Sequence, residues 1–173
     1  RRTPEGLAFR FVGKSGIEHR VLIDDVSVVA AVEAMRRRHG GDRLLAFRNG
    51  SGWADLSSAA VNAYLAELFG GDFTAKDFRT WHATVLAADA LAHSPEPGVT
   101  AASRKRAVRA SVVAVSDYLG NTPAIAKASY IDPRVIDLYE SGATIATAAG
   151  ADYSSADQRQ AALERAVLDL LSL

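Results

Sequence analysis

The chain has 173 residues, and nearly half of them are hydrophobic, which is enough for one domain with a substantial core. It contains no cysteine, which excludes disulfides, thiol nucleophiles and cysteine-based metal sites. The four histidines are scattered without the paired spacing of metal ligands, so we expect no metal. No apolar run is long enough to cross a bilayer, and we expect a protein without membrane contact.

The net charge is zero, which by itself argues against a nucleic-acid binder. The charge is unevenly distributed, however. Residues 1–20 carry five cations against two acids, residues 104–109 carry four cations, and residues 131–173 carry seven acids against three arginines. A solvated basic face beside a solvated acidic face is the simpler explanation on charge alone.

The first half of the chain predicts a small antiparallel sheet and two helices. Residues 7–12 and 19–23 are short β-type runs around a glycine-bearing loop, which indicates a hairpin, and residues 44–47 predict a third short strand. Apolar spacing predicts helices over residues 28–38 and from Ser57 or Ser58 to residue 69.

The second half predicts helices throughout. They cover residues 75–92, 104–119 with Ser103 as cap, 133–140 and 152–173, with 141–151 as a loosely patterned connection. The fold class is therefore α+β, mainly α: a helical domain with a small N-terminal antiparallel β-hairpin or three-stranded sheet. We expect residues 1–173 to form a single catalytic domain.

A short helix is also predicted just before Tyr130. Thr122 is a suitable N-cap, and Pro123 suits the first helical position because its missing N–H has no helical partner there. The helix must end before Pro133, since Asp132 precedes a proline. Tyr130 therefore lies at or just past a helix end, beside an exposed irregular segment, where functional side chains often occur.

The segment Ser129-Tyr-Ile-Asp-Pro-Arg134, preceded by Gly120-Asn-Thr-Pro123, resembles the nucleophile segment of type IB DNA topoisomerases, particularly the compact bacterial and poxvirus-like ones. The resemblance implies that Tyr130 attacks a DNA phosphodiester and becomes joined to a 3′-phosphate. Four other tyrosines compete for this role. Pattern alone places Tyr64 in a core, lets Tyr118 and Tyr139 pack, and puts Tyr153 at the start of the last helix.

The segment Asp77-Phe-Arg-Thr-Trp-His-Ala83 resembles the second catalytic-arginine segment of the same family. The resemblance implies that Arg79 binds the non-bridging oxygens of the scissile phosphate, which suits a planar, always-charged guanidinium. Lys76 lies three residues earlier on the same helix face, at a helix N-terminus that favours anions. Without the resemblance, Arg79 would more often pair with a surface acid such as Asp77.

Two more segments complete the resemblance. Phe11-Val-Gly-Lys-Ser-Gly16 is similar to the family's β-hairpin lysine, which implies that Lys14 protonates the leaving 5′-oxygen. Asn121 stands nine residues before Tyr130, where many relatives have histidine; an asparagine can donate a hydrogen bond to phosphate but carries no charge. Viewed alone, Lys14 is an ordinary solubilising residue and Asn121 an ordinary turn residue.

The family's other catalytic arginine and its N-terminal DNA-clamping domain are not found, so we expect the chain to be the C-terminal catalytic part of a longer protein. The resemblance implies relaxation of supercoiled duplex DNA by a bacterial, cytoplasmic, nucleoid-associated monomer, without nucleotide, ATP or other cofactor. The residues expected to contact the DNA backbone are Lys76, Arg104, Lys105, Arg106, Arg109 and Lys127.

Two alternatives remain open. A tyrosine recombinase shares this type of site, but it would ordinarily have histidine where Lys76 stands, and histidine or tryptophan nearer the tyrosine. A non-catalytic DNA-binding or interaction module would bind DNA in a salt-sensitive way and form no tyrosine adduct.

Overall fold

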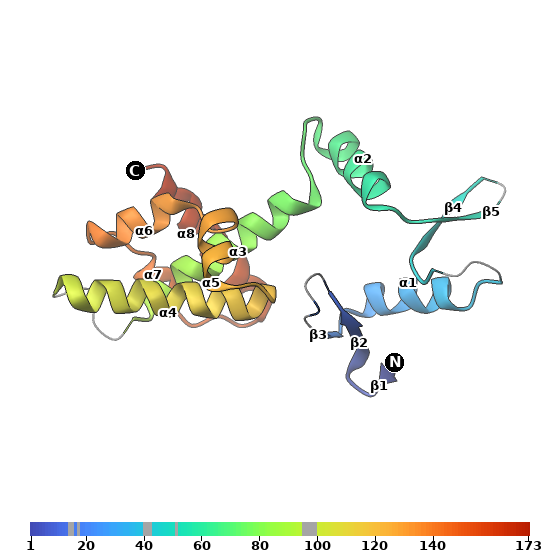
Figure 1. Ribbon diagram of the computed structural model, residues 1–173, viewed down its shortest axis with the longest axis horizontal. Helices are drawn as coiled ribbons and strands as arrows, with labels where there is room; N and C mark the ends of the chain where they lie inside the picture. The colour runs from blue at the N-terminus through green and yellow to red at the C-terminus, as the bar shows by residue number, and fades with distance from the viewer. Residues whose placement is uncertain (14–15, 17, 40–42, 51, 95–99) are drawn as a thin grey trace. The chain divides into compact units, whose positions relative to one another are not determined.

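The computed structural model describes residues 1–13, 16, 18–39, 43–50, 52–94 and 100–173. The chain divides into two compact units, Arg1–Thr74 and Ala75–Leu173 (Figure 1). The first carries the strands and the second is helical, which confirms the mainly helical α+β class. That the two units act as a single catalytic domain stays a prediction. No helix in the described ranges is both long and apolar enough to cross a membrane.

The first unit begins with an antiparallel sheet of β1 (Arg2–Thr3), β2 (Gly6–Val12) and β3 (Glu18–Ile23). The predicted hairpin is confirmed, with Leu7 opposite Ile23 and Val12 opposite Glu18. Gly6 has a φ of 148°, and a Cβ there would lie 2.2 Å from the Ile23 carbonyl oxygen, so the close pairing of β2 with β3 requires glycine.

The strand expected near residues 44–47 forms, but it does not extend this sheet. β4 (Ala46–Asn49) pairs antiparallel with β5 (Gly52–Asp55) in a separate two-stranded sheet. The reason is local: Asn49 pairs with Gly52, and Gly50, at a φ of 43°, lies in the short turn between them that returns the chain on itself.

The first unit also contains α1 (Val26–Arg36) and α2 (Ser58–Phe69). α1 starts at Asp25, whose carboxylate accepts the Val28 N–H, and it buries Val29 and Val32 beside Leu7 of β2. No residue of α2 is buried among the described residues. The expectation that Tyr64 lies in a core is therefore wrong, because 62% of its surface is exposed.

The second unit is built from six helices in its described part, with a shared core of small and branched apolar side chains. α3 packs most extensively against α4, and α4 also packs against α5 (Figure 1). The helices are α3 (Ala75–Ala92), α4 (Ala101–Leu119), α5 (Pro123–Ser129), α6 (Pro133–Glu140), α7 (Ala146–Ala149) and α8 (Ala156–Leu171).

Helix boundaries in this unit follow local signals. α4 starts three residues earlier than expected, because Thr100 is its N-cap and Ser103 is the other member of a reciprocal capping box. The connection over residues 141–151 contains α7 and buries Ile145 and Ala149. The expected packing of Tyr139 is confirmed, with 3% of its surface exposed.

Candidate active site

Tyr130 stands at the junction between α5 and α6. The Thr122 hydroxyl accepts the Ile125 N–H at 3.3 Å and starts α5, and the Tyr130 N–H donates to the Ala126 carbonyl at its end. The helix end was predicted correctly, but Tyr130 is half-buried and packs against the core rather than lying on an exposed segment. The cause is Ile131, which is buried and draws the junction inward.

Arg79, in the second turn of α3, reaches this tyrosine. Its Cζ atom lies 5.1 Å from the centre of the Tyr130 ring, a cation–π contact. Its Nη2 donates to the Leu119 carbonyl at the end of α4, at 2.5 Å. A guanidinium has five donor N–H groups, so this bond leaves others for a bound anion. Arg79 thus connects α3, the end of α4 and the predicted nucleophile.

Asn121 lies in the turn between α4 and α5. Gly120 adopts the left-handed conformation with a φ of 64°, and the Asn121 N–H donates to the Ser116 carbonyl at 2.9 Å, which closes α4. Asn121 therefore has the role of an ordinary turn residue, which its sequence position alone suggested. The side-chain Nδ2 of Asn121 is nevertheless buried and finds no hydrogen-bond partner in the described part of the chain. A buried unpaired donor costs about 1–3 kcal/mol, so this amide has a hydrogen-bonding capacity that the described residues do not use.

The structure therefore brings three of the four predicted catalytic residues into one unit, with Arg79 contacting both Tyr130 and the turn before Asn121. Lys14 lies outside the described residues. Sequence reasoning treated the histidines only as possible metal ligands and did not predict the ring contact of His82 with Tyr118. The centres of the two rings lie 5.1 Å apart.

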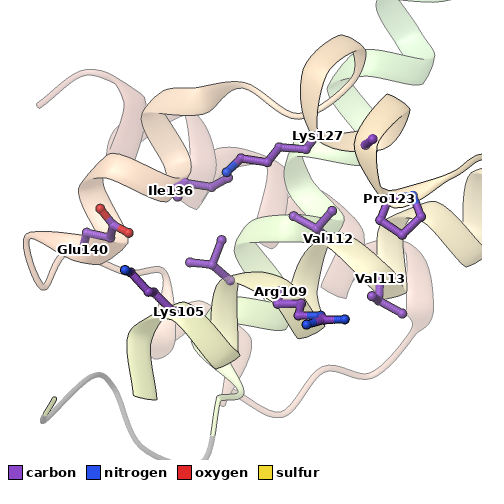
Figure 2. A pocket seen from close by; sticks show the side chains of 10 residues that line it. Lys105, Arg109, Val112, Val113, Pro123, Lys127, Ile136 and Glu140 are labelled. Carbon is purple, nitrogen blue, oxygen red and sulfur yellow. The ribbon is translucent and has the colours of Figure 1, made fainter. Parts of the chain in front are cut away.

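Three of the six predicted DNA contacts line one groove. Lys105, Arg109 and Lys127 line a groove of about 510 Å³ between α4, α5 and α6, together with Glu140 (Figure 2). The floor of the groove is apolar and includes Val108, Val112, Pro123 and Ile136. Lys76 and Arg106 are exposed and Arg104 is half-buried.

Asp132, two residues after Tyr130, is the N-cap of α6. Its carboxylate accepts the Arg134 N–H at 2.9 Å and pairs with the Arg134 guanidinium at 2.8 Å. The side-chain hydrogen bonds from Arg134 hold the pKa of Asp132 below its usual value, and burial opposes them less strongly. The ionised carboxylate therefore stabilises the start of α6.

We expect Asp132→Asn to lower the melting temperature slightly at neutral pH, because asparagine keeps the cap but loses the ion pair. A pKa lowered by folding contributes stability that is present above the unfolded pKa, about 4, and is lost as pH falls through the folded pKa. Thermal melts should therefore show that the difference in melting temperature between wild type and Asp132→Asn becomes smaller as pH falls below about 4.

A family model described as "Eukaryotic DNA topoisomerase I, catalytic core" matches residues 2–148. The match covers most of the chain, and the chain belongs to this family of type IB DNA topoisomerase catalytic cores. Members of this class are isomerases that act on DNA topology. No curated protein matches the chain.

Proposed function

We propose that this protein relaxes supercoiled duplex DNA by cleaving one strand with Tyr130 and resealing it. The observation that carries the proposal is the contact between Arg79 and Tyr130, two residues 51 positions apart, each in a segment that resembles the catalytic segments of the family. A guanidinium over the phenol ring is well placed to bind the phosphate that the phenol oxygen attacks. The family match supports this reading over a recombinase.

In the proposed reaction the Tyr130 hydroxyl attacks the phosphorus atom and loses its proton to solvent. The bond from phosphorus to the 5′-oxygen breaks, and Lys14 delivers a proton to that oxygen. Arg79 and the unpaired Asn121 amide hold the non-bridging oxygens as charge develops. The free strand end rotates, and its 5′-hydroxyl then reverses the reaction. One phosphodiester replaces another in each step, so the chemistry needs no ATP.

The basic side chains then contribute affinity. Lys76, Arg106, Lys105, Arg109 and Lys127 are exposed cations, and cations that contact phosphates position a protein on DNA without reading its sequence. We propose that they hold the duplex against the second unit. We further propose that the protein acts as a monomer on chromosomal DNA in a bacterial cytoplasm. Its alanine- and arginine-rich composition supports the bacterial source alone.

The test is relaxation of a supercoiled plasmid by the full-length protein, with neither ATP nor free divalent metal. We expect topoisomers to relax in steps. A nicked substrate labelled at the 5′ end of the cleaved strand should leave its label on the protein, because the upstream piece keeps the 3′-phosphate. Label transferred only from a 3′-labelled strand would contradict the proposed linkage, and binding without adduct or relaxation would favour a non-catalytic module.

A further inference from the structure

A buried threonine links the two catalytic segments of the second unit. Thr84 lies on α3, five residues after Arg79, and only 2% of its surface is exposed. Its hydroxyl donates to the Thr80 carbonyl at 2.9 Å and accepts the Asp132 N–H at 3.1 Å. The Tyr130 carbonyl lies 3.4 Å from the same oxygen.

The bond to Thr80 by itself implies nothing, because threonines on helices commonly bond to the carbonyl four residues earlier. The contacts to Tyr130 and Asp132 are different, since they cross 46 and 48 residues of sequence. These two backbone groups flank Ile131, at the junction where α5 has ended and α6 begins. Backbone groups at helix ends lack helical partners and need others, and here the Thr84 oxygen accepts the Asp132 N–H at the start of α6 and lies beside the Tyr130 carbonyl.

We propose that Thr84 is a positioning residue for Tyr130, an inference that rests on the proposed function. Arg79 and Thr84 belong to the same helix, so the hydroxyl holds the backbone of the nucleophile in register with the phosphate-binding guanidinium. In-line attack is sensitive to displacements of about 1 Å, which can lower a rate by about 100-fold. Loss of the hydroxyl therefore slows the cleavage step and leaves DNA affinity unchanged.

A purely structural role for Thr84 has a close comparison in the same unit. Ser111 on α4 is also buried, with 3% of its surface exposed, and its hydroxyl donates to the Ala87 carbonyl of α3 at 3.1 Å. That bond also joins two segments distant in sequence, but it does not touch the α5–α6 junction. Ser111→Ala is therefore a matched control for the loss of one buried hydrogen bond.

The experiment measures single-turnover adduct formation by the full-length protein at saturating DNA, beside the dissociation constant for the same DNA. Thr84→Val should slow adduct formation about tenfold or more without changing DNA affinity. Thr84→Ser keeps the hydroxyl and should stay within about threefold of wild type, as should Ser111→Ala. Thermal melts establish that each variant is folded, and Thr84→Ala replaces the valine variant if that one is not.

A second measurement separates this inference from the proposed function. The NMR resonances of the Tyr130 ring should move in Thr84→Val and stay in place in Ser111→Ala. If wild type forms no adduct while the ring resonances still move, the proposed function fails, but the finding that Thr84 fixes the place of Tyr130 does not. Unmoved resonances, a wild-type cleavage rate in Thr84→Val, or equal slowing in Thr84→Ser would each overturn the positioning role.

Discussion

Tyr130→Phe should abolish the covalent protein–DNA adduct and all plasmid relaxation. The substitution removes only the phenol oxygen, which is the attacking atom of the proposed reaction. It keeps the ring that packs against the core and lies under the Arg79 guanidinium. The variant should therefore fold and bind DNA as wild type does. The measurement is denaturing gel electrophoresis of the protein with a labelled, nicked substrate, beside a relaxation assay and a DNA-binding assay.

Tyr118→Phe is the matched control. Tyr118 is in the same unit, 63% of its surface is exposed, and its ring contacts His82 rather than Arg79. It should form the adduct at the wild-type rate. If the adduct survives in Tyr130→Phe and disappears in Tyr118→Phe, the nucleophile has been assigned to the wrong side chain. If the adduct survives in both variants, neither tyrosine is the nucleophile. Tyr153, whose hydroxyl donates to the Ala148 carbonyl at 2.8 Å, would then be tested next.

The surroundings of Tyr130 could be predicted because strong local signals determine them. Thr122, Pro123 and Asp132 each act within one or two helical turns, and the structure places the two helix boundaries where these residues indicate. Local signals also explain the error at α4. Thr100 and Ser103 are both suitable caps three residues apart, and sequence alone does not reveal that they act together in one capping box.

Contacts between distant segments could not be read from the sequence in the same way. Tyr64 lies among apolar residues at helical spacing, but burial requires a partner surface, and no residue of α2 is buried in the described part of the chain. Thr84 shows the opposite case. Nothing near it in the sequence marks it, since the atoms that give its hydroxyl a special role are 46 and 48 residues away. Two cations at a helix N-terminus suggested a phosphate site at Arg79, and the resemblance implied its catalytic role, but neither indicated the contact with Tyr130.

Arg79→Ala should lower the rate of adduct formation at saturating DNA by about 10²–10³-fold, the usual effect of removing one group that stabilises transition-state charge. Arg79→Lys should recover only part of this loss. Lysine keeps the positive charge but lacks the planar fork that can hold the Leu119 carbonyl and a phosphate oxygen together. Single-turnover kinetics over a range of DNA concentrations separate the chemical step from binding.

Lys76→Ala supplies the comparison, because Lys76 is an exposed cation three residues away on the same helix. If its role is to contact the DNA backbone, its loss should weaken DNA binding and reduce the salt dependence of binding, while the rate at saturating DNA stays near that of wild type. The two variants should thus differ in kind: Arg79 affects the rate of cleavage, and Lys76 affects affinity. If Arg79→Ala cleaves at the wild-type rate once it is saturated with DNA, Arg79 contributes only to DNA binding. The Arg79–Tyr130 contact would then be a packing interaction without a role in phosphate activation.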